Sequence, residues 1–566
     1  MKPLITVTHR LDLPAAAALQ NQLEGAELLL FDPQLFDQAR SLGLGNARLA
    51  RTVGPGFMSE VFRRARSDMA AYQARLDAQL AELLPEAEGC QWGYFNAFYA
   101  LLNLRGYAAL GRCLAEDVPA GTVVHLLGAA APYRYGQPSG AACMALAAAL
   151  QGAGVQHRSY LYDAGQLPGP ELPDWRSLEQ RPAARRWAHL PTCFYDKDYL
   201  AAEILAAPGE CLQVPAQFYD VELSGIERLP LRPLAEVRAA LGPAHQQQCE
   251  ALAARVRPIV LEMLAGELRN EAFIQLQAQA LIEALLLQFT LFHDVEQRVQ
   301  ALPAQLLLSN HDSGLLGGML SLARRHRLQV LMLPHAKFQN IPLPKLGGQM
   351  QCLHHPLQGA DCRDTDDRRV PGALLRFGER HQPAPERAPE QPLRTLGVLL
   401  SGLSHNGLST ADIHAYLDGL RQLLDWGRRR GVDVLLRYKP TEGFPLLLQE
   451  SLGLTPESLQ RGVAQPLVAF VQGCDACLGY DIPTSAAIEP LMHAVPMLHC
   501  QLRALVWEEK ALLDRDVVPC LPLGECLDEL DAWWRDPGLQ WDFQRQQHAR
   551  MAQRLAQSPS LLQYLR

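Results

Sequence analysis

The sequence predicts an α/β protein made of two halves, each built from a parallel sheet flanked by helices. Short β-branched or leucine-rich stretches alternate with longer segments of helical apolar spacing, which is typical of strand–helix–strand units. This alternation stops at a proline-rich stretch near residue 390 and then begins again. The strands predicted before the interruption span residues 4–8, 27–31, 122–127, 157–162, 305–309 and 329–333, and those after it span 395–400, 432–437, 475–479 and 496–500.

The proline-rich stretch is the predicted linker, at residues 381–394. Three prolines and alternating charges between 381 and 391 leave few side chains to bury, and a residue that precedes proline favours extended backbone. We therefore predict one domain over residues 1–380 and a second over 395–566. Residues 234–302 are rich in Ala, Leu, Gln and Glu at helical spacing, which predicts a helical insertion in the first domain, placed over the cleft.

The composition excludes some functional classes. The chain has 566 residues, a net charge of −8 and 20% charged residues, which argues against a general nucleic-acid binder. No apolar run reaches about 18 residues and no signal peptide is evident, so we expect a cytoplasmic protein without a membrane span. The basic C-terminal helix, residues 545–566, either contacts a membrane surface peripherally or packs on the first domain.

The 13 cysteines are scattered, which is typical of reduced thiols. Cys474 and Cys477 form a Cys-x-x-Cys pair inside an apolar stretch, with no second pair at the spacing of zinc ligands. We therefore interpret them as buried thiols of a strand and predict no metal site.

Polar side chains follow the predicted strands of the second half, where ligands of parallel sheets bind. Arg437 and Lys439 end one buried strand and Pro440 stops it, so two cations are available for a phosphate or carboxylate. The alternative is an ordinary solvated strand end.

The next strand of the second half runs to Gly479 and is followed by Tyr480. Thr484 or Ser485 then begins a predicted helix, and the free N–H groups of a helix start bind phosphate. Glu489 lies one turn further on the same face, where its carboxylate suits ribose hydroxyls. An ordinary capped helix with a surface glutamate is the alternative.

A small polar loop follows the first strand of the second half. Gly402 permits close approach of backbone, and Ser401, His405 and Asn406 supply small hydrogen-bonding groups. The loop lacks the full G-x-G-x-x-G spacing, and the chain has no Walker A sequence.

In the first half, His311 and Asp312 follow a predicted buried strand, and His335 follows the next one. His311 or Asp312 suits a general base for an acceptor hydroxyl, whereas the alternative for Asp312 is a simple helix cap. Tyr133 and Arg134 follow an earlier strand, and we expect them on the acceptor side.

This set of motifs resembles a group of bacterial surface-polysaccharide transferases. The group includes the Kdo transferases of capsule synthesis, sialyltransferases and other nonulosonate transferases, and CDP-glycerol transferases. The resemblance covers residues 305–345 and 395–500 and rests on a strand ending in Pro-His, a basic residue before proline, and a Thr-Ser helix start with a glutamate. It implies a GT-B enzyme, in which two Rossmann-like domains face a central cleft.

The resemblance also suggests roles. The group's His-Pro is here Lys439-Pro440, and its His-Gly is His335-Ala336. By this resemblance Lys439 takes over the contact with the CMP phosphate, Thr484 and Ser485 hold the donor phosphate, and Asp312 is favoured over His311 as the base.

We therefore predict a metal-independent glycosyltransferase without a cofactor. Its donor is a nucleotide sugar, first of all a CMP-linked acidic sugar such as Kdo or a nonulosonic acid, and its acceptor is a glycan or protein hydroxyl. The alternatives are a CDP-polyol phosphotransferase or nucleotide-sugar epimerase of the same architecture, and a non-catalytic scaffold.

Overall fold

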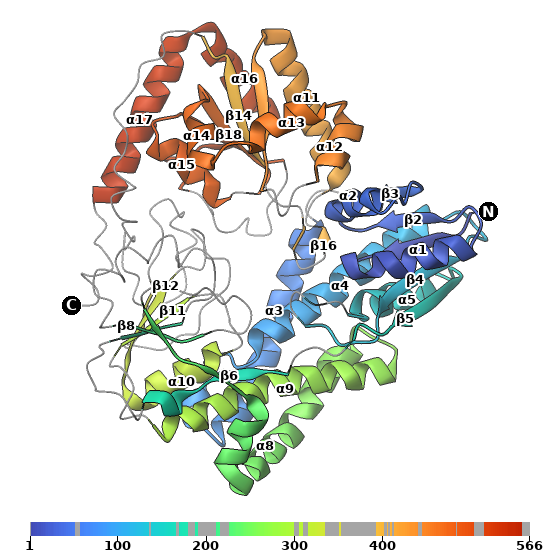
Figure 1. Ribbon diagram of the computed structural model, residues 1–566, viewed down its shortest axis with the longest axis vertical. Helices are drawn as coiled ribbons and strands as arrows, with labels where there is room; N and C mark the ends of the chain where they lie inside the picture. Colours follow the sequence, from blue (N-terminus) through green and yellow to red (C-terminus); the bar gives the residue numbers. More distant parts are fainter. Residues whose placement is uncertain are drawn as a thin grey trace.

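Figure 1 shows the computed structural model of the chain, which contains three parallel sheets and several long helices. The described residues are 2–50, 57–134, 137, 139–165, 169–178, 187–190, 211–215, 226–298, 305–309, 315–333, 350–352, 392–400, 404–405, 408–409, 412–439, 444–482, 484–502 and 514–556. All statements below concern these residues.

The first sheet, called sheet A, has the strand order β3-β2-β1-β4-β5 with every pair parallel. This is the order of a Rossmann sheet, with its switch point between β1 and β4. The strands are β1 (Leu4–Val7), β2 (Glu27–Leu30), β3 (Ala47–Leu49), β4 (Val124–Ala129) and β5 (His157–Tyr162). The helices of this part are α1 (Leu13–Gln22), α2 (Pro33–Ser41), α3 (Phe57–Ala81), α4 (Tyr94–Asp117) and α5 (Ala141–Gly152), with short 3-10 turns at Arg10–Asp12 and Pro85–Ala87.

The second sheet, sheet C, also consists of parallel pairs, in the order β13-β12-β11-β7-β8-β9. In chain order this is again the Rossmann arrangement, and its switch point lies between β7 and β11. Its strands are β7 (Trp187–Leu190), β8 (Cys211–Gln213), β9 (Glu227–Arg228), β11 (Gln305–Ser309), β12 (Gln329–Leu333) and β13 (Met350–Cys352). Helix α10 (Leu316–His326) connects β11 to β12.

The third sheet, sheet D, has the order β17-β14-β18-β19-β20, and all of its pairs are parallel. Its strands are β14 (Thr395–Leu400), β17 (Asp433–Arg437), β18 (Ala476–Tyr480), β19 (Met497–Cys500) and β20 (Cys520–Leu521). The helices are α11 (Ile413–Arg430), α12 (Pro445–Leu452), α13 (Pro456–Val463), α14 (Leu467–Gln472), α15 (Ile488–Met492), α16 (Leu523–Arg535) and α17 (Pro537–Ala556), with a 3-10 turn η9 at Ser485–Ala487. Small antiparallel pairs join β6 (Glu171–Pro173) to β10 (Leu231–Pro233), and β15 (Ser404–His405) to β16 (Leu408–Ser409).

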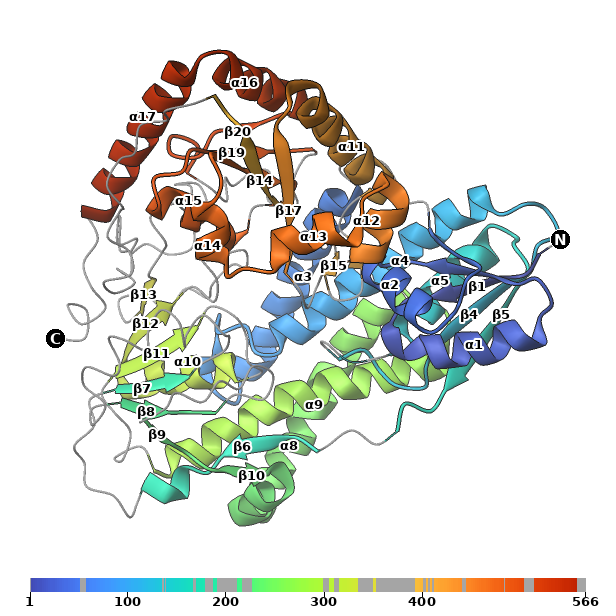
Figure 2. The same ribbon diagram turned by 45° about the horizontal axis from the view of Figure 1, so that its top comes forward.

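A helical hairpin connects sheets A and C. It consists of α8 (Leu234–Ala265) and α9 (Glu271–Glu296), and Figure 2 shows α9 extending from the helices of sheet A to sheet C. Two fully buried glutamines of α9, Gln277 and Gln288, form hydrogen bonds with the backbone of neighbouring segments. The amide of Gln277 accepts from the Tyr133 N–H at 2.6 Å and donates to the Tyr133 carbonyl at 3.2 Å, while Gln288 accepts from the Gly318 N–H of α10 at 3.2 Å.

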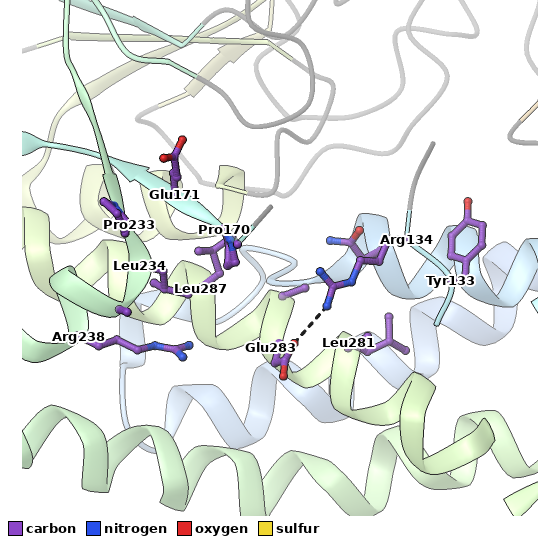
Figure 3. Close-up of a pocket in the computed structure, with 15 residues that line it drawn as sticks. Tyr133, Arg134, Pro170, Glu171, Pro233, Leu234, Arg238, Leu281, Glu283 and Leu287 are labelled. Atoms are coloured by element: carbon purple, nitrogen blue, oxygen red, sulfur yellow. Dashed lines mark hydrogen bonds and ion pairs between the residues drawn. The ribbon is translucent and has the colours of Figure 1, made fainter. Parts of the chain in front are cut away.

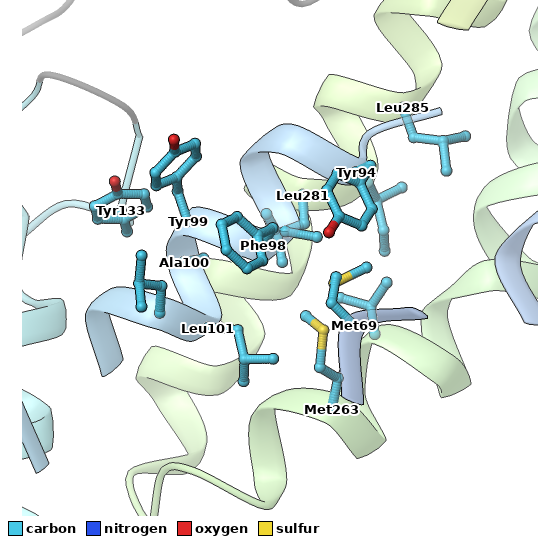
Figure 4. Packing of buried hydrophobic residues seen from close by; sticks show 14 of the residues in the cluster. Met69, Tyr94, Phe98, Tyr99, Ala100, Leu101, Tyr133, Met263, Leu281 and Leu285 are labelled. Carbon is cyan, nitrogen blue, oxygen red and sulfur yellow. The ribbon is translucent and has the colours of Figure 1, made fainter. Parts of the chain in front are cut away.

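The largest buried cluster lies where this hairpin packs on α3, α4 and α5. Figure 4 shows Met69 of α3, Phe98 of α4, and Met263 and Leu281 of the hairpin in this cluster. The Phe98 ring lies edge-on to Phe62, with centroids 5.1 Å apart, a preferred aromatic geometry. Sheets A and C therefore rest on one shared helical core.

Helix α9 is the one described helix that is long and apolar enough to cross a membrane. However, 61% of its most apolar stretch is buried, and it packs against α4, α8 and α10. Glu283 and Gln288 also interrupt this stretch. We therefore interpret α9 as a core helix.

The α/β class and the parallel sheets in both halves are confirmed, and the helical block is present as the α8–α9 hairpin. Apart from the antiparallel β6–β10 pair, the strands described before residue 380 form two parallel sheets, A and C, where the sequence suggested a single unit. Residues 467–472, between the predicted strands of sheet D, form helix α14. The predicted linker, apart from residues 392–394, lies outside the described residues, so the domain boundaries stay predictions.

Candidate functional site

The predicted site residues follow neighbouring strands at the carboxyl edges of sheets C and D. Several of them lie outside the described residues: His311, Asp312, His335, Ser401, Gly402, Asn406 and Pro440. His405 lies in β15 and Ser485 begins η9, and only their backbone is described. The geometry of the site therefore comes from Arg437, Lys439, Tyr480, Thr484 and Glu489.

Sheet D has a topological switch point between β14 and β18. Numbered within the sheet, its order is 2-1-3-4-5, in which the connections leave β14 in opposite directions. Ligands of such sheets bind in the crevice beyond the carboxyl ends of the two strands at this point. Leu399 is paired with Arg437 of β17, and Leu400 is paired with Tyr480 of β18. The three predicted donor segments thus follow three adjacent strands, β17, β14 and β18.

Arg437 is held by the turn between α13 and α14. Its Nη1 donates to the carbonyls of Gly462 at 3.0 Å and Gln465 at 2.6 Å, and its guanidinium lies over the Phe470 ring at 5.6 Å. Burial lowers the pKa of Arg437 from its ordinary value. The side chain therefore shapes the carboxyl edge of β17 by fixing the α13–α14 turn.

Beyond Arg437, the chain passes through Tyr438 to Lys439. Lys439 is exposed, so its ammonium is at the surface at this edge of the sheet. Tyr438 is half-buried, and its pKa is raised by burial and by the charge of Asp37 from α2. Of the two predicted cations, Lys439 is thus the exposed residue and Arg437 the partly buried one.

Tyr480 belongs to the core, which corrects its assignment to the donor site. It is fully buried, and its hydroxyl donates to the Tyr416 carbonyl of α11 at 2.8 Å. The Tyr480 and Tyr416 rings meet edge-on with centroids 4.9 Å apart. Burial raises the pKa of Tyr480 well above its usual range. The side chain connects β18 to α11 and does not reach a ligand at the surface.

The turn after β18 depends on residues that the sequence did not single out. Asp481 has φ +66°, and its carbonyl lies 2.9 Å from Nε2 of the buried His499 in β19. Burial lowers the pKa of His499 to about 4, so the neutral ring donates from Nε2. A Cβ at Gly479 would lie 2.6 Å from His499 Nδ1, so this strand position needs glycine. The sequence signals that could have pointed to this turn are the glycine in β18, Gly479, and the histidine in the next strand, His499.

The segment predicted as a helix from Ser485 is divided into two short elements. The η9 turn is followed by α15, which has five residues, and the Thr484 carbonyl accepts from the Ala487 N–H at 3.1 Å. Thr484 is half-buried. The Glu489 carboxylate is 3.9 Å from Nε2 of His493, one turn later, and its side chain is 23% exposed. A helix dipole contributes little here, so side-chain groups must supply most of any ligand contact.

Both cysteines of the Cys-x-x-Cys pair are buried as predicted, but only Cys477 belongs to a strand, β18. Cys474 and Cys477 are buried, and the pKa of the Cys477 thiol is raised by its hydrogen bond with Cys474 and by burial. Among the described residues, no three His, Cys, Asp or Glu side chains gather closely enough to hold a metal ion.

The switch point of sheet A is filled by the protein's own carboxylate. Asp12, which is 1% exposed, accepts from the N–H groups of Thr8 and His9 at 2.9 and 2.8 Å and from the Tyr162 hydroxyl at 2.8 Å. The pKa of Asp12 is raised because burial outweighs these hydrogen bonds. The amides after β1 that could receive a phosphate in a Rossmann sheet are therefore already used.

A cavity of about 610 Å³ lies between the loop after β4, the β6–β10 pair and the α8–α9 hairpin. Tyr133 and Arg134, which we expected on the acceptor side, line it together with Arg238 and Glu283. The part played by residues of α8 and α9 in this lining could not be predicted, because the packing of the hairpin against the β4 loop is a long-range contact.

Comparison with known proteins finds no matching family model and no matching curated protein. Solved structures with partial likeness include a spinosyn rhamnosyltransferase, with 13% identity, a TM-score of 0.35 and coverage of 67% of this chain and 99% of that chain. A sucrose-phosphate synthase from Thermosynechococcus elongatus has 11% identity, a TM-score of 0.35 and coverage of 66% and 95%. A UDP-forming α,α-trehalose-phosphate synthase from Burkholderia xenovorans has 11% identity, a TM-score of 0.33 and coverage of 66% and 96%. With TM-scores this low, no residue role is transferred from these proteins.

Proposed function

We propose that the protein is a glycosyltransferase whose nucleotide-sugar donor binds beyond the carboxyl ends of β17, β14 and β18. The observation that carries this proposal is the switch point of sheet D, where three polar segments follow three adjacent parallel strands. Ligand crevices of parallel sheets form at such points. The equivalent edge of sheet A is filled by Asp12, which makes it the poorer nucleotide site.

Each described residue has a proposed task in this crevice. The exposed ammonium of Lys439 neutralises negative charge on the departing phosphate, an electrostatic contribution that favours the transition state. The Thr484 hydroxyl and the Ser485 segment bind the same phosphate, and the Glu489 carboxylate accepts from ribose hydroxyls. Arg437 acts as a positioning residue, since its Nη1 is used by the carbonyls of Gly462 and Gln465.

The reaction proceeds with Asp312 as the base, a role that we propose on the residue pattern. Asp312 takes the proton of an acceptor hydroxyl as the acceptor oxygen bonds to the anomeric carbon of the sugar. The bond between that carbon and the phosphate oxygen breaks, and the nucleotide leaves with both bonding electrons. We propose that this occurs without a metal ion, with Lys439 supplying the positive charge.

For the donor we propose a CMP-linked acidic sugar, and for the acceptor a hydroxyl of a surface glycan or protein. This choice rests on the resemblance of the Lys439-Pro440 and Thr484-Ser485 motifs to transferases of acidic sugars and polyol phosphates. The carboxylate of such a sugar adds a second negative charge that the Lys439 edge can stabilise.

The proposal is tested by thermal unfolding with CMP, CDP, UDP and GDP and their sugar conjugates. A ligand at 100 times its dissociation constant adds about 2.7 kcal/mol of stability, so the correct nucleotide raises the melting temperature measurably. Lys439→Ala should abolish this increase. Lys2→Ala, at an exposed lysine beside the first strand, is the matched control and should retain it.

Two results would argue against the proposal. An absence of stabilisation by every nucleotide would favour a non-catalytic scaffold. An unchanged response of Lys439→Ala would remove Lys439 from the donor site. A nucleotide that stabilises the protein is then supplied as its sugar conjugate together with candidate acceptors. Release of the nucleotide with transfer of the sugar to an acceptor indicates a transferase, whereas an epimerase transfers no sugar.

A further inference from the structure

The cavity between α8, α9 and the β4 loop is lined by both apolar and charged side chains. Figure 3 shows Pro170, Pro233, Leu234 and Leu287 on one side, with Arg238 beside Leu234, and the Arg134–Glu283 pair next to Leu281. Leu234, Leu281 and Leu287 give an apolar surface, and all three are buried. At about 610 Å³ the cavity lies within the range of small-molecule sites, roughly 300–1,000 Å³.

The wall formed by the β4 loop is fixed by α9. The buried amide of Gln277 forms hydrogen bonds with both the N–H and the carbonyl of Tyr133. These hydrogen bonds fix the backbone next to Arg134, and this restricts the positions that its guanidinium can take. Arg134 then reaches Glu283 of α9, with Nη2 3.3 Å from the carboxylate. The cavity is therefore preformed, which lowers the entropic cost of binding.

Arg238 is the arginine of the cavity lining whose positive charge has no carboxylate partner among the described residues. Arg134 is neutralised by Glu283, and the Glu171 carboxylate is directed away from Arg238 in Figure 3. Among the described residues no carboxylate lies within ion-pair distance of Arg238: its Nε is 3.5 Å from Thr290 Oγ1, and its buried Nη2 has no hydrogen-bond partner. Arg238 also borders a second cavity of about 650 Å³, which is lined mostly by residues of α8.

We propose that this cavity binds an amphipathic carboxylate. The Arg238 guanidinium pairs with the carboxylate, and the leucine wall holds the apolar body. A single uncompensated positive charge suits one negative charge better than a doubly charged phosphate. This site is separate from the crevice of sheet D and does not depend on the proposed transferase activity.

The experiment measures the binding of octanoate to the full-length protein by isothermal titration calorimetry, with octanamide as the uncharged analogue of equal length. Octanoate should bind at least tenfold more tightly than octanamide. Arg238→Gln should remove this preference, and Arg238→Lys should keep part of it because the positive charge stays while the planar guanidinium is lost. Arg269→Gln, at an exposed arginine after α8, is the matched control and should leave octanoate binding unchanged.

A second variant tests the cavity itself. Ala284→Phe places a ring among the lining residues of α9 and should abolish the binding of both compounds. Equal affinities for octanoate and octanamide, binding of octyl phosphate in preference to octanoate, or unchanged binding in Ala284→Phe would each overturn the proposal. No nucleotide is present in these titrations, so their failure is distinguishable from a failure of the proposed transferase.

Discussion

The carboxylate of Asp37 in α2 accepts the backbone N–H of Leu446 at 2.7 Å, so a residue from the helices of sheet A caps helix α12 of sheet D. The same carboxylate accepts from the Leu447 N–H at 3.1 Å. Nearby, Arg40 pairs with Glu450 at 2.9 Å, and Phe36 and Leu448 belong to one buried cluster. Sheets A and D are therefore held together by a helix cap, an ion pair and shared apolar packing.

Asp37→Ala should destabilise the protein by about 1 kcal/mol, the usual cost of losing an N-terminal helix cap. Chemical unfolding followed by tryptophan fluorescence measures this change. Asp418→Ala is the control, since Asp418 is an exposed residue that pairs with Arg421 on the same helix, and exposed pairs of this kind contribute about 0–1 kcal/mol. Equal effects of both substitutions would show that the cap does not stabilise the contact.

Tyr480→Phe should destabilise the protein by about 0.5–1.5 kcal/mol, because the hydrogen bond from the Tyr480 hydroxyl is lost while the Tyr416 carbonyl keeps its bond within helix α11. Nucleotide binding should stay unchanged, since the Tyr480 hydroxyl points into the core. Unfolding and nucleotide titration of the same variant check both statements. A loss of nucleotide affinity without a loss of stability would return Tyr480 to the donor site.

Arg437→Ala should destabilise the α13–α14 turn by about 1.5–3 kcal/mol, the range for a hydrogen bond that involves a charged group. Nucleotide affinity should fall less than in Lys439→Ala, because Arg437 acts through the turn. Hydrogen exchange of residues 456–472 is the appropriate measurement, and faster exchange there is expected. An undisturbed turn together with lost nucleotide binding would instead indicate direct contact.

Asp77 of α3 should make stability depend on pH. Burial raises the pKa of Asp77 to about 6, although the Gln73 amide donates to it at 2.8 Å. An unfolded carboxyl titrates at about 4, so the folded state holds this proton more tightly. The resulting stabilisation is complete below pH 4 and is lost as the pH rises through about 6.

Asp77→Asn should remove this dependence. The free energy of unfolding of the wild type, relative to Asp77→Asn, should therefore decrease between pH 4 and pH 7. Urea unfolding at several pH values gives the two curves. If they run parallel over this range, the buried carboxyl is not the titrating group.

The sequence predicted strands such as β14 and β18, because each is a short apolar run bounded by turns. It missed shorter strands of the parallel sheets, namely β3, β7, β8, β9, β13 and β20. It did not separate sheet A from sheet C, since strand pairing such as that of β7 with β11 depends on contacts far apart in the chain. The positions after β17 and β18 were predicted as site residues, but not the directions of their side chains. Tyr480 is buried against α11, and Arg437 forms hydrogen bonds with the α13–α14 turn. Both arrangements depend on tertiary packing, which the sequence pattern does not show.

The location of the nucleotide is the central claim, and photo-crosslinking tests it most directly. An azido derivative of the nucleotide that stabilises the protein is activated by light, and the labelled peptides are mapped by mass spectrometry. The account predicts labels in residues 401–411, 437–443 and 481–489, which follow β14, β17 and β18. Labels confined to residues 8–12 and 130–134 at the edge of sheet A would contradict it.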